Sequence, residues 1–267
     1  MRRGVEAGVL HPGAMGASLG AALRQNCATV LWAAAGRSPE TRQRAGQAGL
    51  TEVPDVPTLA SRAQVILSIC PPHAAQDVAR EVARHAIQDL QLYIDANAVA
   101  PGTIDRIAEL FGEDRVVDAA LVGPPAWRPG TFLWLSGPRA AEAAELFADT
   151  PLDVRVLGDR LGQASMAKVC FALQSKAMPT IWLAMAAAAN AYGVLAPVRD
   201  VLAEDGIDLD AQLASIERRA RPKAWRWAGE MDEAAAALTA LDLPEGWSRA
   251  AAEMYRRLAS GTGPSCS

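Results

Sequence analysis

The chain has 267 residues, of which 51% are hydrophobic and 21% are charged. This composition excludes a disordered chain, and the length allows one large domain or two of moderate size. The formal net charge of −4 disfavours a dedicated nucleic-acid-binding protein, because such proteins usually carry a basic surplus. The cysteines are scattered and form no CxxC pair. We therefore expect buried, reduced thiols, no metal site and a reducing, cytoplasmic location.

Two segments bear on targeting and membranes. The N-terminal segment contains two arginines but no long apolar region before a cleavage site, so we expect no signal peptide. The stretch 177–198 is the one to test as a membrane span. It contains Pro179, Asn190 and Pro197 and is dominated by alanine, which is nearly neutral for membrane insertion. A buried helix between domains is the better interpretation, and we expect no membrane partner.

The first half of the chain alternates short β-branched runs with alanine-rich amphipathic stretches. The runs that we expect to form strands are Val5–Leu10, Thr29–Ala33, Val65–Ile69, Leu92–Asp95, Val116–Val122, Thr131–Ser136 and Val154–Leu157. The stretches that we expect to form helices are Ala14–Gln25, Pro39–Ala48, His73–Ala86, Pro101–Phe111 and Pro138–Phe147. Strands separated by helices of this length predict βαβ units and a parallel sheet. The strands are apolar almost throughout, which is typical of a sheet covered on both faces.

After Gly158 the pattern changes to helix alone. We expect one long alanine-rich helix over Gln163–Tyr192, bent near Pro179 because proline cannot continue the helical hydrogen-bond pattern. The shorter helices that we expect are Val198–Asp205, Leu209–Ala220, Ala224–Leu241 and Trp247–Leu258. The sequence therefore predicts an α/β fold with a doubly wound Rossmann sheet in an N-terminal domain, residues 1–157. An all-helical domain follows, residues 158–267.

A glycine-containing turn joins the first expected strand to the first expected helix. It places Gly13 and Gly16 at the second and third glycine positions of the dinucleotide-binding fingerprint GxGxxG, and His11 at the first. Such a turn lets the backbone approach a pyrophosphate at the N-terminus of a helix. An ordinary strand-to-helix turn is the alternative. The cofactor contacts that we predict in this turn are His11, Pro12, Gly13, Ala14, Met15 and Gly16.

The end of the second expected strand favours NADP (NADPH) over NAD. An NAD site needs Asp or Glu there to bind the ribose 2′-hydroxyl, and the segment Trp32–Pro39 contains neither. Arg37 can pair with a 2′-phosphate, and Arg42 lies about one helical turn further along. Ser38 is expected to cap a helix that begins at Pro39, and the N-terminus of that helix would face the same anion. Solvated surface arginines before a capped helix are the alternative.

A series of segments, taken in order and spacing, resembles the β-hydroxyacid dehydrogenase superfamily, which includes 6-phosphogluconate dehydrogenase and the imine reductases. The segments are HPGAMG, WAAAGRS, SICPP (Ser68–Pro72), DANAVAP (Asp95–Pro101), DAALVGPP (Asp118–Pro125), GQASMAK (Gly162–Lys168) and AWRWAGEM (Ala224–Met231). The last segment resembles the small helical C-terminal domain of a phosphogluconate-dehydrogenase-like branch whose substrates are mostly unassigned. The resemblance covers nearly the whole chain and implies an NADPH-dependent oxidoreductase with a small-molecule substrate.

The resemblance implies a catalytic role for Lys168. In the superfamily, a lysine at the start of the long helix between the domains acts as general acid/base, and Lys168 occupies that place, six positions after Gly162. A hydride that moves between nicotinamide and a carbinol carbon requires a proton to move at the oxygen. A lysine desolvated between domains can have its pKa lowered far enough to transfer that proton near neutral pH. The alternative is a surface lysine on an amphipathic helix.

The resemblance also implies contacts around the cofactor. The residues concerned are Cys70, Pro71, Pro72 and Asn97, and Asn97 is also expected near the substrate. A helix N-terminal loop is the alternative for Asn97.

The superfamily's substrate loop usually reads SGG and holds a carboxylate through backbone and hydroxyl donors. Here Gly123 matches, the serine is absent, and Pro124 and Pro125 have no N–H to donate. We predict substrate contacts from these residues, with a plain turn as the alternative. Trp127 and Arg128 follow the loop and either contact the substrate or form part of a surface loop.

The residues after Lys168 depart from the superfamily's pattern. The acid-handling members have two asparagines three and four residues after the lysine, and Phe171 and Ala172 stand there in this chain. A more apolar substrate site disfavours a phosphorylated sugar acid or a simple β-hydroxyacid, and it leaves room for a bulkier or less charged carbonyl or for an imine. Lys176 lies about two helical turns from Lys168 and is a candidate for the missing cation, with a structural role as the alternative.

Three functions remain open at this point. The first is reduction of a carbonyl, or oxidation of the reverse alcohol, with Lys168 as acid/base. The second is imine reduction, and the third is a nucleotide-binding protein without catalysis. The resemblance further implies that the helical domain interlocks with a second subunit, so we expect a homodimer through the apolar stretch Ala177–Leu195.

Overall fold

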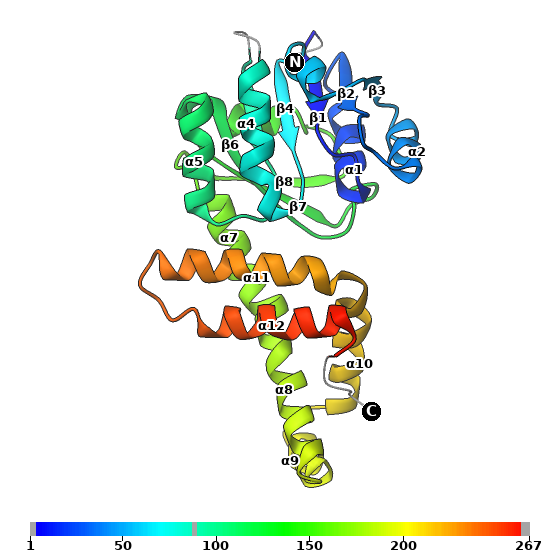
Figure 1. Cartoon of the computed structure of the whole chain (residues 1–267), viewed down its shortest axis with the longest axis vertical. Helices are drawn as coiled ribbons and strands as arrows, with labels where there is room; N and C mark the ends of the chain where they lie inside the picture. Colours follow the sequence, from blue (N-terminus) through cyan, green and yellow to red (C-terminus); the bar gives the residue numbers. More distant parts are fainter. Residues whose placement is uncertain (1–3, 87–89, 263–267) are drawn as a thin grey trace. The chain divides into compact units, whose positions relative to one another are not determined.

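The computed structural model describes residues 4–86 and 90–262. The chain divides into two compact units, Met1–Lys168 and Val169–Ser267 (Figure 1). The division falls inside helix α7 (Gln163–Ala172), whereas the boundary predicted from the sequence precedes this helix. The first unit contains the sheet, and the second consists of helices.

The first unit is built on an eight-stranded sheet in the order β3-β2-β1-β4-β5-β6-β7-β8. The strands are β1 (Glu6–Val9), β2 (Thr29–Ala33), β3 (Thr51–Val53), β4 (Val65–Ser68), β5 (Leu92–Asp95), β6 (Val116–Val122), β7 (Thr131–Ser136) and β8 (Leu152–Gly158). All neighbouring strands from β3 to β6 are parallel. The order of the first six strands is that of a dinucleotide-binding Rossmann sheet, in which the strand order reverses at β1 and β4. The predicted α/β fold with a helical C-terminal region is therefore confirmed.

The last two strands depart from the prediction. β7 runs antiparallel to β6, so the sheet is not fully parallel as predicted. The connection between them, residues 123–130, is fully described and contains no helix, and a short connection of this kind joins neighbouring strands in opposite directions. β8 lies at the edge of the sheet, where Val156 and Leu157 are 47% and 39% exposed, so it is not covered on both faces.

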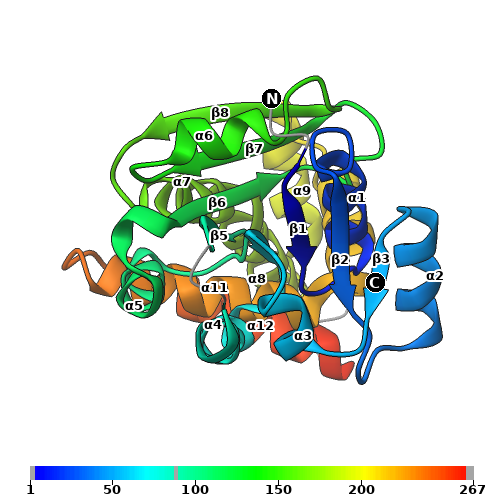
Figure 2. The ribbon, with the colours of Figure 1, turned by 90° about the horizontal axis from the view of Figure 1, so that it is seen from above.

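Helices cover both faces of the rest of the sheet (Figure 2). On one face, α1 (Ala14–Leu23), α2 (Pro39–Gln47) and α6 (Ala140–Glu145) contribute side chains to the core. On the other face, α3 (Val56–Ala60), α4 (Ala75–His85) and α5 (Pro101–Phe111) do so. Successive residues of β2 alternate between the two cores, with Trp32 in one and Leu31 in the other. This double coverage explains why the strands are apolar almost throughout.

The second unit contains the end of α7 and helices that follow it along the chain. These are the π-helical turn η3 (Leu173–Ala177), α8 (Met178–Ala191), α9 (Leu195–Glu204), α10 (Leu209–Ala220), α11 (Ala224–Thr239) and α12 (Gly246–Ser260). The predicted long helix is thus interrupted by a π-helical turn just before Pro179, which has no N–H for the carbonyl of Ser175. Leu183, Leu213 and Ile216 belong to a small core of this unit. No helix in the described ranges is long and apolar enough to cross a membrane.

Candidate active site

The turn after β1 exposes the N-terminus of α1 at the point where the strand order reverses. Gly13 is the N-cap, and no described side chain caps the helix, so the N–H groups of its first turn are available to an anion. A Cβ on Gly13 would meet no described atom within 4 Å, whereas a Cβ on Gly16 would lie 2.1 Å from the carbonyl oxygen of His11. The fingerprint requires room for the pyrophosphate at the second glycine and close packing of the helix at the third, and Gly13 and Gly16 meet these two requirements.

His11 and Arg37 lie close to each other beside this turn. Burial, together with the nearby charge of Arg37, lowers the pKa of His11 from 6.5 to about 4. Burial also lowers the pKa of Arg37, although the charge of Glu81 opposes that shift. The Nδ1 atom of His11 and the Nε atom of Arg37 are buried and have no hydrogen-bond partner among the described residues. Two buried nitrogens without partners fit a ligand rich in phosphate oxygens, so these residues suit a dinucleotide.

The depressed pKa of His11 predicts a loss of stability in acid. Between about pH 6.5 and pH 4, the unfolded chain binds a proton at this imidazole that the folded chain excludes. The contribution of His11 is therefore fully present above about pH 6.5, and it falls by up to roughly 3 kcal/mol as the pH decreases to 4, at about 1.4 kcal/mol per pKa unit. Urea unfolding of wild type and His11→Gln at both ends of this interval measures the effect. The glutamine variant should lose less stability on acidification, and equal losses would contradict the prediction.

Arg37 and Arg42, which follow β2, have different surroundings. Ser38 caps α2 as predicted, since its Oγ accepts a hydrogen bond from the backbone N–H of Thr41 at 3.3 Å. Arg42 donates to Glu52 on β3 at 2.6 Å, and its guanidinium carbon lies 5.8 Å from the centre of the Trp32 ring. Because Glu52 partly neutralises Arg42, this ion pair argues against the predicted role of Arg42 at a 2′-phosphate. Arg37 is the stronger candidate.

Asn97 connects the ends of β4 and β5. Its side chain is 2% exposed, and its Oδ1 accepts a hydrogen bond from the backbone N–H of Cys70 at 2.5 Å. Its Nδ2 donates to Ser68 Oγ at 3.1 Å and to Asp95 Oδ2 at 2.8 Å. This bonding argues against the predicted direct contacts of the Asn97 side chain with cofactor and substrate. Instead, Asn97 positions the start of the Cys70–Pro72 segment.

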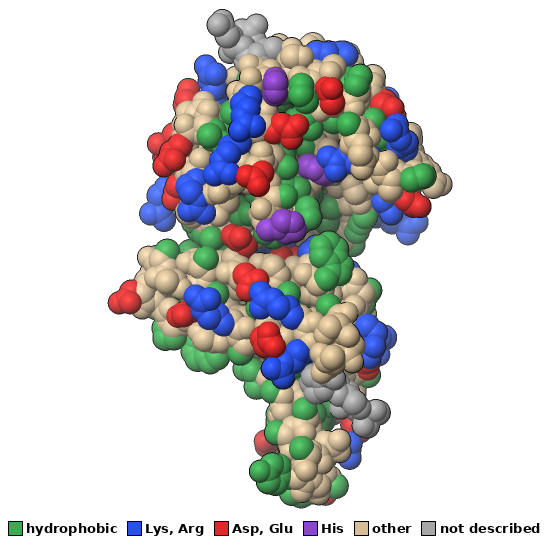
Figure 3. Space-filling view, viewed as in Figure 1, with side chains coloured by type: hydrophobic (Ala, Val, Ile, Leu, Met, Phe, Trp, Pro, Cys, Tyr) green, Lys and Arg blue, Asp and Glu red, His purple; other side chains and the backbone are tan. Residues whose placement is uncertain are grey.

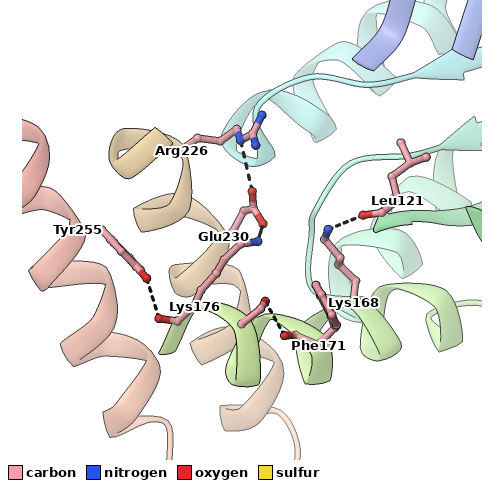
Figure 4. Close-up of polar contacts among 8 residues, drawn as sticks. Leu121, Lys168, Phe171, Lys176, Arg226, Glu230 and Tyr255 are labelled. Atoms are coloured by element: carbon pink, nitrogen blue, oxygen red, sulfur yellow. Dashed lines mark hydrogen bonds and ion pairs between the residues drawn. The ribbon is translucent and has the colours of Figure 1, made fainter. Parts of the chain in front are cut away.

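Lys168 is part of α7, and its side chain reaches the end of β6. Its ammonium group donates a hydrogen bond to the carbonyl oxygen of Leu121, near the carboxyl end of that strand (Figure 4). Residues His11–Gly16, which we call the phosphate turn after their predicted ligand, follow the carboxyl end of β1, and β1 runs parallel to β6 in the same sheet. Lys168 and the phosphate turn therefore lie along the same edge of the sheet, which we call the carboxyl edge. In open α/β sheets, ligands bind at this edge.

The buried carboxylate of Asp118 holds the start of α7 in place. It accepts hydrogen bonds from the backbone N–H of Ser165 at 2.9 Å, from Ser165 Oγ at 2.6 Å and from Ser136 Oγ at 3.0 Å. Ser136 Oγ in turn accepts from the backbone N–H of Ala164 at 2.9 Å. Burial raises the pKa of Asp118, and the hydrogen bonds from Ser165 oppose this shift. The network fixes the helix one turn before Lys168 and so positions the lysine.

The roles of Asp118 and Ser18 were not predicted from the sequence. The signal for Asp118 was present, because a carboxylate inside an otherwise apolar strand must find buried hydrogen-bond donors. No comparable signal marks Ser18, which lies on α1. Its hydroxyl accepts a hydrogen bond from the backbone N–H of Ala126 at 2.9 Å and donates to the carbonyl of Met15 at 2.8 Å. Ser18 thereby ties the β6–β7 loop to the helix of the phosphate turn.

The β6–β7 loop, residues 123–130, is closely packed. Gly123 has φ +139°, and a Cβ there would lie 2.6 Å from the carbonyl oxygen of Gly130. Thr131 Oγ1 donates to the carbonyl oxygen of Pro124 at 2.5 Å. Only glycine combines this φ with so close a contact, so the loop requires Gly123. Gly123, Pro124 and Pro125 come directly after the end of β6, to which the Lys168 side chain bonds.

The remaining predicted substrate residues belong to the second unit. Phe171 is 39% exposed and Ala172 is buried. Lys176 is 7% exposed and forms an ion pair with Glu230 of α11, while Tyr255 donates to its backbone carbonyl at 2.7 Å (Figure 4). Because a buried carboxylate already satisfies this ammonium, the ion pair argues against Lys176 as a cation for substrate and supports a structural role.

The cysteines add little to this site. Cys27 is buried and Cys70 is half-buried, but Cys170 is exposed, so the expectation of buried thiols is wrong for Cys170. Cys266 lies outside the described residues. Within residues 4–86 and 90–262, no cluster of three or more His, Cys, Asp or Glu side chains could hold a metal ion.

Comparison with known sequences identifies one domain family and a distant relative. Residues 189–258 match the family described as "Domain of unknown function (DUF1932)". An uncharacterized 28.5 kDa protein from Methanothermus fervidus is 25% identical over 169 residues. This match covers 63% of the present chain and 65% of that protein.

Comparison with solved structures shows the fold. A conserved protein of unknown function, described as similar to 3-hydroxyacid dehydrogenases, matches over 96% of this chain and 97% of its own, with 24% identity and a TM-score of 0.69. The 3-hydroxyisobutyrate dehydrogenase of Mycobacterium tuberculosis matches over 98% and 96%, with 17% identity and a TM-score of 0.69. This chain has the 3-hydroxyacid dehydrogenase fold. A reductive aminase from Aspergillus terreus, solved with NADPH and ethyl levulinate, has 16% identity over 98% and 96% of the chains and a TM-score of 0.56. These likenesses confirm the predicted resemblance at the level of the fold.

Proposed function

We propose that this protein is an NADPH-dependent oxidoreductase that transfers a hydride between nicotinamide and a carbonyl or alcohol carbon of a small molecule. The observation that carries the proposal is the place of Lys168 at the carboxyl edge, where its ammonium group bonds to the Leu121 carbonyl. The fold shared with a 3-hydroxyisobutyrate dehydrogenase and with an NADPH-bound reductive aminase supports it.

The phosphate turn and Arg37 would hold the cofactor, which supplies or accepts the hydride when it is bound. The first-turn N–H groups of α1 would bind the pyrophosphate, and the open face of Gly13 would allow its close approach. Arg37 would pair with the 2′-phosphate through a guanidinium whose Nε has no partner among the described residues. The absence of an acidic residue between Ala33 and Pro39 is compatible with that phosphate.

Lys168 would move the proton at the substrate oxygen. In the direction of reduction its ammonium group donates a proton to the oxygen that gains electron density, and in the direction of oxidation the neutral amine accepts the hydroxyl proton. The hydrogen bond to the Leu121 carbonyl and the bonds between Asp118 and Ser165 restrict the position of the Lys168 ammonium group. The proton donor is therefore in place before the substrate binds.

Imine reduction is the second candidate. The likeness in fold to a reductive aminase favours it, as do Phe171 and Ala172, which stand where acid-handling members of the superfamily carry asparagine. An imine can arrive already protonated, so it depends less on a lysine acid. A nucleotide-binding protein without catalysis is the third candidate, and cofactor turnover separates it from both enzymes.

A substrate panel with NADPH tests the proposal. Ketones, β-keto acids and cyclic imines are incubated with enzyme and NADPH, and oxidation is followed by nicotinamide absorbance, with NADH as the matched control. We expect turnover of at least one carbonyl compound and faster turnover with NADPH than with NADH. NADPH binding without turnover of any compound would contradict the enzyme proposal and favour the non-catalytic alternative.

We also propose a homodimer through the helical unit. On the face shown in Figure 3, hydrophobic side chains of this unit lie among charged ones. The largest exposed apolar residues there include Met178, Ile181, Tyr192, Val201, Trp225 and Trp247. A monomer that exposed so many large apolar groups would be poorly soluble, and a second copy can cover them. Light scattering should give at least twice 28.1 kDa, and Ile181→Glu should weaken the assembly. A wild-type monomer of 28.1 kDa at micromolar concentration would contradict the proposal.

A further inference from the structure

Positions 124–127 of the β6–β7 loop have no backbone donor to offer a ligand. Pro124 and Pro125 have no N–H group. The N–H of Ala126 donates to Ser18 Oγ at 2.9 Å, and the N–H of Trp127 donates to the carbonyl oxygen of Pro125 at 2.9 Å. In the described structure, positions 124–127 therefore have no backbone N–H left for a ligand.

The hydroxyl groups around the loop are also engaged. Thr131 Oγ1 donates to the Pro124 carbonyl at 2.5 Å, and Ser18 Oγ donates to the Met15 carbonyl at 2.8 Å while it accepts from Ala126. A Cβ on Gly123 would lie 2.6 Å from the carbonyl oxygen of Gly130, so the backbones of these two residues run close together. A carboxylate placed against positions 124–127 would lose its hydration without gaining a backbone hydrogen bond from them, which is unfavourable.

The same loop presents an apolar surface. Trp127 is 48% exposed, and its backbone is held by the bond to Pro125. The two proline rings precede it along the chain, and the loop begins two residues after Leu121, the partner of Lys168. An indole with flanking proline rings suits an alkyl or aromatic group rather than an anion.

From this arrangement we infer that the substrate carries no carboxylate next to its reacting carbon and instead presents an uncharged, apolar group to Pro124, Pro125 and Trp127. This inference rests on the proposed function and narrows its substrate class to neutral ketones, keto esters or imines. Trp127 becomes a specificity-determining residue in addition to the proton donor Lys168.

Matched pairs of ligands test the inference. A β-keto acid and its methyl ester share a skeleton and differ mainly in charge, so both are assayed with NADPH, and the matching hydroxy acid and hydroxy ester are titrated into the enzyme–NADPH complex by calorimetry. We expect the ester to show about 100-fold higher kcat/KM and tighter binding, because the acid loses solvation without gaining a backbone hydrogen bond from positions 124–127. Tighter binding of the hydroxy acid would overturn the inference whether or not turnover is seen. A bound ester that is never turned over would overturn the proposed reaction but not the inference.

Variants of the β6–β7 loop test which of its residues set the preference for the ester. Pro125→Ala restores one backbone N–H and should narrow the ester-to-acid ratio of kcat/KM by about tenfold, as expected for one hydrogen bond to a charged group. Pro138→Ala, an exposed proline outside the loop, is the control and should leave the ratio unchanged. Trp127→Ala should raise KM for the ester by about tenfold, and Trp127→Phe should restore most of it. An unchanged ester-to-acid ratio in Pro125→Ala would show that the missing N–H does not set the preference, and this result would overturn the inference. Loss of acid binding in Arg128→Ala would show that the loop recognises an acid, and it would overturn the inference as well.

Discussion

Lys168→Ala is expected to reduce turnover by about 10²- to 10⁴-fold, the usual contribution of a positioned general acid. The reason is the place of the ammonium group at the carboxyl edge, where it bonds to the Leu121 carbonyl. NADPH binding should survive, because the phosphate turn follows β1, whereas Lys168 bonds to β6, and β4 and β5 lie between these strands. Steady-state kinetics on the best carbonyl substrate, combined with an NADPH titration, separate these two effects.

A second substitution at Lys168 and a stability measurement are the controls for this prediction. Lys168→Arg should not restore turnover, because a guanidinium keeps its proton at any working pH. The alanine variant should fold normally, since Asp118 and Ser136, not Lys168, hold the start of α7. Thermal unfolding checks this point. Near-normal turnover of a carbonyl substrate by Lys168→Ala would rule out this residue as the acid, and near-normal turnover of an imine alone would favour imine reduction.

Arg37→Ala is expected to weaken NADPH binding by roughly ten- to a hundredfold and to leave NADH binding almost unchanged. Only the 2′-phosphate needs the guanidinium, and a charge-assisted hydrogen bond contributes ~1.5–3 kcal/mol. The unpartnered, buried Nε of Arg37 is ready to donate such a bond. Titration of both cofactors, followed by nicotinamide fluorescence, measures the two affinities.

Arg42→Ala is the matched control for Arg37→Ala. Arg42, on α2, pairs with Glu52 of β3 at 2.6 Å, so its removal should weaken NADPH binding less than the removal of Arg37. Equal losses of NADPH and NADH affinity in Arg37→Ala would contradict the assignment of NADP, because both cofactors share the pyrophosphate but only one carries the 2′-phosphate.

The sequence by itself determined the features that depend on local patterns. β2, β5, β6 and β7 begin and end where the apolar runs predict. For β6 and β7 the reason is clear, since Arg115, Gly123, Gly130 and Gly137 bound them. The cap at Ser38 and the close packing of Gly16 also follow from neighbouring residues. β3 and α3, with three and five residues, were not predicted, because they are too short to show a periodic pattern of apolar residues.

The tertiary structure alone decided how the candidate site is assembled. Asp118 meets Ser165 across 47 residues, Lys176 meets Glu230 across 54, and Ala126 meets Ser18 across 108. No local pattern encodes such partners, because a side chain's own sequence neighbours do not specify which distant donor or acceptor the fold brings to it. The resemblance implied the role of Lys168 as the acid, and that role stays a prediction, whereas the fold showed the hydrogen bonds that hold the start of α7. The fold likewise showed that Asn97 and Lys176 already have buried partners.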